Sequence, residues 1–483
     1  MDTNWMTTLA KHYAGARSRY PDAPLLLLFD IDGTILDSRY LVLYLFQTYD
    51  LQHETRYFRD LTLADVELHE RAVGEYISHL SIPPEEQIRI LDWFRNYRWS
   101  RGAILESHRP YQGVLEVIRW FQLQPNTFIG LNTGRPEEAR QETLRSLNEL
   151  GKEWRVKFDD SLLFMNPDVE NTRTAAAKVM GVRHFQHAGY RVITLIDNEP
   201  SNLEAVATID PGQEILLLHA DTIFHSKRES LPDHAVPGVD YSLKTLLARN
   251  RFELQLPRHI EFVWHGLSDR RRIERFTQSD VRWGECNVRM DRLSRRLVVR
   301  STSLADRPLR ADEEVLLADD LLSLFLKTDK GLKLDLKMGG ELLDLLLERI
   351  EQHDFPNERL WIHGRVERIE PSGFQRLSSA LPGAIVQCPI DFLTPLVLAA
   401  PDVARDILDR IASWGVNRVS VSWQTPRIRW MIEKLDAWGF EINIHGAPDL
   451  EAFLQAAVLL PRSISARFGR EFDMDTQHRS ATS

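Results

Sequence analysis

Residues 25–38 read LLLLFDIDGTILDS, an apolar run that ends abruptly at Asp30, Asp32 and Gly33. This pattern is typical of a fully buried strand whose carboxyl end carries polar groups, the place where open α/β sheets bind their ligands. Two carboxylates at i and i+2 of an extended chain point to the same side. They need a nearby cation to stay ionised, and Mg²⁺ is the simplest choice because it prefers oxygen ligands. A strand ending in an ordinary acidic turn remains the alternative.

The bulk composition indicates a globular protein of several domains. At 483 residues, with 43% hydrophobic and 27% charged residues, the chain should hold two to four domains. The net charge of −10 argues against nucleic acid as the main partner.

Two cysteines, Cys286 and Cys388, exclude a disulfide framework and suit a reducing cytoplasm. We see neither a signal peptide nor an apolar run of the length of a membrane span, so we expect a cytoplasmic location and no membrane span. The oligomeric state is not predicted.

The first half of the chain predicts an α/β domain with a helical insertion. A short helix over residues 1–20 precedes the strand at 25–29, and residues 38–108 carry helical spacing that predicts a cap of about four helices. Strand and helix then alternate, which predicts a Rossmann-like doubly wound parallel sheet over residues 1–225. Its further strands are expected at 127–132, 162–166, 190–196 and 214–220. A composition shift predicts a linker over 226–258.

The second half predicts a (β/α)₈ TIM-type barrel over residues 259–469. Eight short strand candidates are separated mostly by helical segments. They lie at 259–265, 281–289, 332–337, 359–365, 384–390, 416–423, 440–445 and 463–468. RRLVVR at 295–300 should add a hairpin strand to the second, and residues 470–483 read as a disordered tail.

The strand ends of the first domain carry the groups that phosphoryl transfer needs. Asp30 can attack phosphorus and form an aspartyl-phosphate, and Asp32 can protonate the leaving oxygen and later deprotonate a water. Thr133 offers a hydroxyl and an amide to phosphoryl oxygens, and Asp197 supplies a second carboxylate for Mg²⁺. A lysine should neutralise charge beside the nucleophile. Lys178 competes with Lys152 and Lys157 for this role, and we favour Lys178 because it precedes Asp197 by 19 residues, the length of a helix, a loop and a strand.

Four segments together resemble the motifs of the haloacid dehalogenase superfamily of phosphohydrolases, over residues 24–225. They are DIDGT at 30–34, NTGR at 132–135, Lys178 in AAAKVMG, and IDNEPSN at 196–202. The resemblance implies a Rossmann-like fold, a cap inserted at 38–108, and Mg²⁺ bound by Asp30, the Asp32 carbonyl and Asp197. Many members of that family carry a second acid where this chain has Asn198, which can orient a water but brings no charge.

Residues beside the catalytic candidates are expected to bind the substrate: Gly33, Thr34, Gly134, Arg135 and Asn198. Thr133-Gly134 also fits an ordinary strand–helix turn, and Arg135 fits either a clamp on a second substrate anion or a salt bridge to the cap. Because a cap of four helices would cover the site and exclude water, a small phosphorylated molecule fits better than a polymer.

The second domain carries weaker signals. His265 ends its first strand, Glu285 and Asn287 stand at i and i+2 on the second, and Asp335 and Lys337 on the third. Glu285, Asn287 and Asp335 could together bind a divalent ion, and a buried salt-bridge network with Lys333 or Lys337 is the alternative.

Several segments of this half resemble the glycerophosphodiester phosphodiesterase-like barrels, and in particular the menorin family. They are WHG, WGECNVR, LVVRSTS, GLKLDLK and SVSWQT. The second strand departs from the acid-x-acid pattern of active phosphodiesterases, and Ser301-Thr302 stands where His-Asp is normal. The usual acid/base pair is therefore missing, which favours a barrel that binds rather than cuts.

The sequence therefore predicts a Mg²⁺-dependent phosphatase fused to a binding barrel or a degenerate phosphodiesterase barrel. A bifunctional phosphodiesterase/phosphatase and a non-catalytic interaction protein are the two alternatives.

Overall fold

The computed structural model describes residues 4–66, 73–221, 230–247, 259–310, 313 and 315–467. The chain forms two compact units, Met1–Leu254 and Gln255–Ser483. The predicted tail at 470–483 lies outside the described residues. Within the described ranges, no helix is both long enough and apolar enough to cross a membrane.

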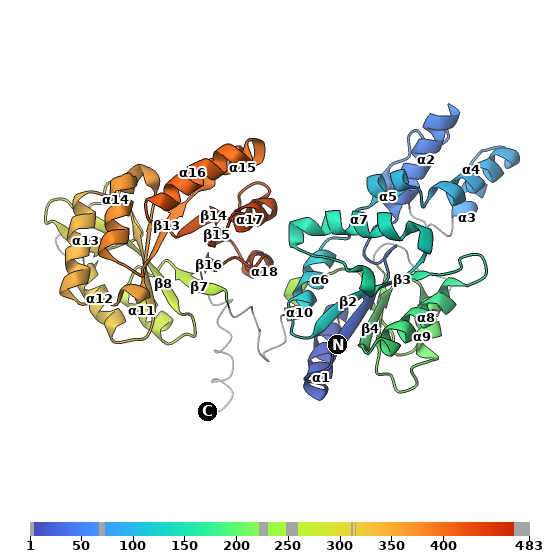
Figure 1. Cartoon of the computed structure of the whole chain (residues 1–483), viewed down its shortest axis with the longest axis horizontal. Helices are drawn as coiled ribbons and strands as arrows, with labels where there is room; N and C mark the ends of the chain where they lie inside the picture. Colours follow the sequence, from blue (N-terminus) through green and yellow to red (C-terminus); the bar gives the residue numbers. More distant parts are fainter. Residues whose placement is uncertain are drawn as a thin grey trace. The chain divides into compact units, whose positions relative to one another are not determined.

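The first unit is built on a six-stranded parallel sheet with the order β3-β2-β1-β4-β5-β6 (Figure 1). The strands are β1 (Leu25–Phe29), β2 (Thr127–Pro136), β3 (Leu163–Asn166), β4 (Arg191–Asp197), β5 (Leu216–Ala220) and β6 (Val236–Gly238). All five residues of β1 are buried, as its unbroken apolar run predicts. The switch in strand order falls beside β1, so the carboxyl ends of β1, β2 and β4 meet there.

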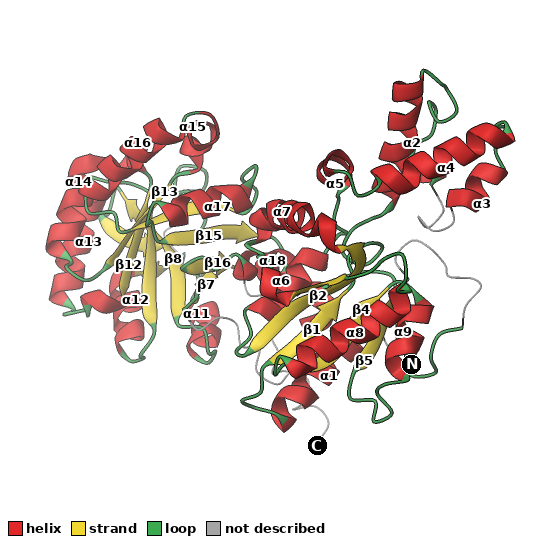
Figure 2. Cartoon of the chain, turned by 45° about the vertical axis from the view of Figure 1, so that its right-hand side comes forward, coloured by secondary structure: helices red, strands yellow, loops and turns green. Residues whose placement is uncertain are grey.

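Helices cover both faces of this sheet, which confirms the predicted doubly wound fold (Figure 2). One face carries α8 (Thr174–His187) and α9 (Pro200–Ala207). The other carries α1 (Trp5–Arg19), α6 (Val114–Gln122) and α10 (Leu243–Leu247). Another helix, α7 (Arg140–Gly151), follows β2.

The linker predicted for 226–258 is wrong over residues 236–247, which belong to the first unit. β6 pairs with β5, and the buried Tyr241 that follows it donates a hydrogen bond to the carbonyl of Thr34 at 2.9 Å. The Tyr241 ring also lies 4.8 Å from that of Trp5 on α1. No strand signal is present at this point because β6 has only three residues, Val-Pro-Gly, and lies at the sheet edge, where proline is tolerated.

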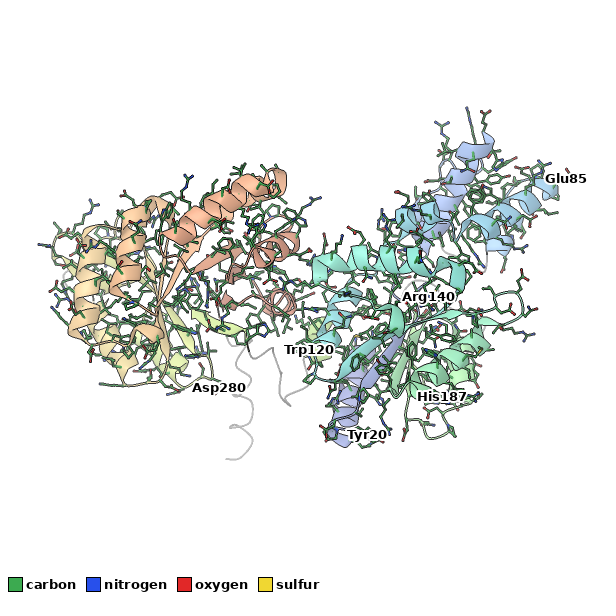
Figure 3. The ribbon with its side chains drawn as sticks, in the orientation of Figure 1. Tyr20, Glu85, Trp120, Arg140, His187 and Asp280 are labelled. Atoms are coloured by element: carbon green, nitrogen blue, oxygen red, sulfur yellow. The ribbon has the colours of Figure 1, made fainter. Side chains whose placement is uncertain are left out.

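The insertion between β1 and β2 is helical, as predicted. Its described residues include α2 (Arg39–His53), α3 (Val73–Ser78), α4 (Pro84–Tyr97), α5 (Arg101–Ser107) and a 3₁₀ turn (Leu63–Asp65). These helices bury their own hydrophobic cluster, in which Phe46 and Phe58 stack at 4.2 Å. Glu85, in the first turn of α4, lies at the tip of this cap (Figure 3). The two connections to the sheet domain pair with each other, since Asp37 N donates to Arg109 O at 2.9 Å.

The second unit is a closed barrel of eight parallel strands, as predicted. The strands are β7 (Glu261–His265), β8 (Trp283–Asp291), β11 (Gly331–Leu336), β12 (Leu360–Gly364), β13 (Ile385–Pro389), β14 (Arg418–Ser422), β15 (Ile442–Ala447) and β16 (Ser463–Ala466). Pairing of β7 with both β16 and β8 closes the barrel. The predicted extra strand is β9 (Arg296–Val299), antiparallel to β8, and it is followed by the short β10 (Leu316–Leu317).

Helices surround the barrel strands (Figure 2). They are α11 (Arg270–Thr277), α12 (Ala318–Leu326), α13 (Glu341–Gln352), α14 (Val366–Ala380), α15 (Thr394–Ala399), α16 (Pro401–Ser413), α17 (Ile428–Ala437) and α18 (Leu450–Val458). Polar side chains that point inward near the carboxyl ends of the strands therefore face a common pocket.

Candidate active site

Three carboxylates and a lysine meet at the carboxyl edge of the first sheet. Asp30 directly follows β1, Asp32 lies in the next turn, and Asp197 is the last residue of β4, which pairs with β1. Lys178 reaches them from α8. Asp30, Asp197 and Lys178 are all buried, so their charges interact in a medium where water screens little.

Lys178 bridges the two strand ends. Its Nζ pairs with Asp30 and lies 2.8 Å from Oδ2 of Asp197, and it donates to the carbonyl of Asn132 at 2.5 Å. Lys152 and Lys157, the two competing lysines, are exposed. Of the three lysines, Lys178 is therefore the one that lies beside the carboxylates, where the spacing predicted it.

The negative charge of this cluster exceeds what Lys178 neutralises. Burial raises the pKa of Asp30 to about 7, and repulsion from Asp197 and Asp32 adds to this effect while Lys178 opposes it. For Lys178 itself, burial lowers the pKa, but attraction to Asp197 and Asp30 outweighs burial and leaves the pKa raised. The lysine therefore stays protonated, and a second cation beside Asp30 would favour its ionised form.

Main-chain and side-chain donors fix the orientation of Asp197. Its Oδ1 accepts from the amide of Glu199 at 2.9 Å and from Nδ2 of Asn202 at 3.0 Å. Its Oδ2 therefore faces Lys178. The neighbouring Asn198 packs against Gly33, whose φ is +78° and where a Cβ atom would overlap the Asn198 amide. The loops after β1 and β4 are therefore fitted closely to each other.

Asp32 is held by Arg135 in a two-pronged ion pair, with Nη2–Oδ1 at 2.6 Å and Nε–Oδ2 at 2.7 Å. Arg135 is itself buried and donates to Thr143 Oγ1 at 2.9 Å. Its Cζ atom lies 5.0 Å from the centre of the ring of Trp99, a residue of the cap. Arg135 was predicted to clamp a second substrate anion or to form a salt bridge to the cap; it contacts the cap through the ring of Trp99, and its salt bridge described here is to Asp32. The partnership with Asp32 was not predicted.

His108, where the chain returns from the cap, is a site neighbour that sequence reasoning missed. Its Nε2 lies 3.0 Å from Nη2 of Arg135, and its Nδ1 lies 2.7 Å from the hydroxyl of Ser146. Because an arginine can only donate, the imidazole accepts from it at Nε2 and carries its proton on Nδ1. No motif marks this position, since a lone histidine after a helix has no distinctive spacing.

The remaining predicted substrate-binding residues line the same loops. Thr133 is buried, and its hydroxyl lies 3.3 Å from the amide of Arg135. A side chain at Gly134 would overlap Thr174 at the start of α8. The buried hydroxyl of Thr34 has no hydrogen-bond partner among the described residues, so it is available to a ligand.

The oxygen donors at this edge suit a magnesium ion. In the described part of the chain, no three His, Cys, Asp or Glu side chains form a ready-made metal cluster. The predicted site does not need one, because Mg²⁺ is commonly held by one or two carboxylates together with waters and substrate oxygens. Asp30 and Asp197 supply the two carboxylates, and a cation beside Asp30 would oppose the burial and the repulsion from Asp197 that raise its pKa.

The environment of His108 predicts an acid-sensitive fold. Burial, with a smaller effect of Arg135, lowers the pKa of His108 to about 3. In the unfolded chain a histidine takes up a proton near pH 6.5, so the stabilisation present above that pH is lost as the pH falls toward 3. Between pH 7.5 and pH 5 the unfolding free energy of the wild type should fall. For His108→Asn we expect this fall to be smaller by about 2 kcal/mol.

Urea unfolding at the two pH values measures this difference. The control is His187→Gln, at the exposed carboxyl end of α8 (Figure 3), which should lose as much stability as the wild type. An equal loss in the His108 variant would contradict the prediction.

In the barrel, His265, Glu285 and Asp335 line one cavity, whereas Asn287 is not among its lining residues. Glu285 lies 3.2 Å from Nζ of Lys333, and Asp335 pairs with Lys337. These are the ion pairs of the alternative prediction. A lysine ammonium stands against each carboxylate, and Asn287 does not line the cavity, so the three predicted ligands do not come together as a divalent-metal site.

Comparison with known proteins finds likeness in fold alone. No protein-family model matches the chain, and no curated protein matches it. Its structural neighbours include both haloacid dehalogenase-superfamily hydrolases and glycerophosphodiester phosphodiesterases.

A HAD-superfamily hydrolase of subfamily IA from Geobacter sulfurreducens is 13% identical, with a TM-score of 0.30, covering 44% of this chain and 91% of its own. An Oleispira antarctica phosphodiesterase is 12% identical, with a TM-score of 0.34, covering 44% and 95%. A glycerophosphodiester phosphodiesterase from Agrobacterium tumefaciens is 15% identical, with a TM-score of 0.31, covering 43% and 96%. At these scores the neighbours carry no argument about chemistry, which rests on the residues themselves.

Proposed function

We propose that the first unit is a Mg²⁺-dependent phosphatase that hydrolyses a small phosphoric monoester through an aspartyl-phosphate. The observation that carries the proposal is the buried Lys178, which faces both Asp30 and Asp197 beside the Asp32–Arg135 pair. A carboxylate flanked by a fixed cation, with a second carboxylate nearby for proton transfer, is the arrangement that covalent phosphoryl transfer requires.

In the first step a carboxylate oxygen of Asp30 attacks phosphorus and the bond from phosphorus to the ester oxygen breaks. Protonated Asp32 gives its proton to the leaving oxygen. In the second step Asp32 takes a proton from a water whose oxygen attacks the phosphorus. This step breaks the acyl-phosphate bond, releases inorganic phosphate and restores the Asp30 carboxylate.

Arg135 is proposed to orient Asp32 and to contact the substrate. Both Asp32 oxygens are held by Arg135, which fixes the position of the carboxylate. The phosphoryl oxygens of a substrate would offer this guanidinium a further acceptor. Thr34 and Thr133 would donate to the same oxygens.

Asp30, the main-chain carbonyl of Asp32 and Asp197 are the residues proposed to hold Mg²⁺, with Asn198 orienting a water. The ion would neutralise the phosphoryl oxygens and the attacking carboxylate. We expect EDTA to lower the hydrolysis of an aryl phosphate by at least about 100-fold and excess Mg²⁺ to restore it, an effect of the size that one charge-stabilising group contributes.

An aryl phosphate assay with and without EDTA tests the proposal. Calcium should not restore the rate, because its larger ion prefers more ligands at longer distances. Full activity in EDTA would contradict the role of the metal. No hydrolysis by the Mg²⁺-loaded protein, for the aryl phosphate and for a panel of phosphorylated metabolites, would overturn the proposed function.

The cap restricts the substrate to a small molecule in this proposal. It contributes Trp99 over Arg135 and leads into His108, so it reaches the residues around Asp32. Small anions can enter below such a cover, whereas a polymer chain would have to displace it. A cytoplasmic location, suggested by only two cysteines, is part of the proposal.

A further inference from the structure

The carboxyl end of the barrel contains a cavity of about 430 Å³, a size suited to a small ligand. Five cationic side chains and two carboxylates line it. The cations are Lys333, Lys337, Arg365, Arg368 and Arg467, and the carboxylates are Glu285 and Asp335. Arg365 has no carboxylate partner in the described part of the chain. The formal charge of the lining therefore favours an anion.

Lys333 defines the floor of this cavity. It is buried, stands opposite Glu285 in the pairing of β11 with β8, and lies 3.2 Å from the Glu285 carboxylate. Its Nζ also contacts the hydroxyl of Ser465 at 3.0 Å and lies 4.4 Å from the centre of the Trp361 ring. The Lys333 ammonium therefore balances the charge of the Glu285 carboxylate inside the cavity.

Two buried amides leave hydrogen-bonding atoms unpaired in the cavity wall. The oxygen of Asn443 accepts from the hydroxyls of Ser463 and Ser465 at 2.8 and 3.3 Å. Its amide nitrogen has no partner among the described residues, although the residue is completely buried. Unpaired buried donors are costly, so this N–H group is suited to an acceptor atom of a ligand.

Gln387 presents the opposite chemistry. Its amide nitrogen lies 2.8 Å from Nδ1 of His363, which leaves Nε2 of that imidazole to carry the proton. The Gln387 side-chain oxygen is buried and has no partner within the described ranges. A ligand hydroxyl would satisfy it. The cavity wall therefore offers donors and cations for an oxyanion, and an acceptor for a hydroxyl.

We propose that this cavity binds a small hydroxylated oxyanion without a divalent metal. Lys333, Asn443 and His363 receive the oxyanion, Gln387 accepts from a hydroxyl, and Arg365 adds charge at the exposed rim. A sugar monophosphate and a sugar acid share this chemistry. The site is separate from the phosphatase residues, and the proposal goes beyond the activity assigned to the first unit.

Calorimetric titration in EDTA tests the site on the full-length Asp30→Asn variant, which should not turn over a phosphate ester. Ribose 5-phosphate and gluconate represent the two oxyanions, and inorganic phosphate and ribose represent each feature alone. At least one of the two hydroxylated anions should bind with a dissociation constant about 10-fold lower than either single-feature probe, the effect of roughly one additional good hydrogen bond. The preferred anion distinguishes a phosphate from a carboxylate site.

Matched variants locate the binding. Arg365→Ala, at an exposed position before α14, should weaken binding of the preferred anion about 10-fold. Arg376→Ala, on the exposed surface of the same helix, should not change it. Asn443→Leu should also weaken binding, and its far-UV circular dichroism will show whether the barrel stays folded.

Three results would overturn the proposal. They are the absence of binding for both hydroxylated anions, binding that requires Mg²⁺, Mn²⁺ or Ca²⁺, and equal affinity in the two arginine variants. Since the assay contains no metal and lacks Asp30, a failure here is distinguishable from a failure of the phosphatase proposal.

Discussion

Replacing Asp30 with asparagine is expected to slow hydrolysis of an aryl phosphate by at least about 10³-fold, because the variant keeps the shape of the site but lacks the attacking oxygen. The fold should survive this change. Burial disfavours the charge of Asp30 and raises its pKa to about 7, and Lys178 keeps Asp197 and the Asn132 carbonyl as partners. Initial rates with Mg²⁺ at saturating substrate measure the effect.

Asp37→Asn is the matched control for Asp30→Asn. Asp37 is also a buried aspartate, seven residues further along the same loop, but it pairs with Arg39 and not with the carboxylate cluster. It should cost some stability and leave the rate within a few-fold of wild type. The aspartyl-phosphate can be sought by mass spectrometry after mixing Asp32→Asn with substrate, since its breakdown should be slowed. Equal rates in wild type and Asp30→Asn would exclude Asp30 as nucleophile.

The sequence predicted the first sheet and its site to the extent that they depend on local patterns. The apolar run before Asp30 and the alternation of helix and strand were enough for the central strands, because parallel strands with two covered faces are continuously hydrophobic. Asp197 could be placed because parallel topology brings strand ends together, and Lys178 because it precedes Asp197 by 19 residues. The three-residue β6 escaped detection because tertiary pairing, and not its own composition, makes it a strand.

Contacts between distant polar side chains were the part that the sequence left open. Arg135 was recognised as a functional cation, but its pairing with Asp32, and the support from His108 and Thr143, depends on how the cap connections return to the sheet. In the barrel, strand alternation predicted that Glu285 and Asp335 face inward. Whether a metal or a lysine would face Glu285 depended on the register of β8 against β11, which places Lys333 beside it.

Lys178→Met is expected to have the largest effect on stability, because it leaves Asp30 and Asp197 buried without their common cation. Removing one partner of a buried ion pair typically costs about 3–5 kcal/mol, and we expect a loss of this size at pH 8 in EDTA. The loss should be smaller at pH 5, because Asp30, with its pKa of about 7, is then protonated and carries no charge to be left unpaired. Urea unfolding at both pH values measures it.

Two further variants separate charge from packing in this effect. Lys178→Met combined with Asp30→Asn should regain part of the lost stability, since one of the two unpaired charges is gone. Lys152→Met, which removes an exposed lysine beside Glu149, should change stability by less than about 1 kcal/mol. Mg²⁺ should stabilise Lys178→Met more than the wild type, because the ion would supply the missing positive charge between the two carboxylates. If Lys178→Met is as stable as the wild type in EDTA, then Lys178 does not neutralise the buried carboxylates, and the charge arrangement on which the phosphatase proposal rests is wrong.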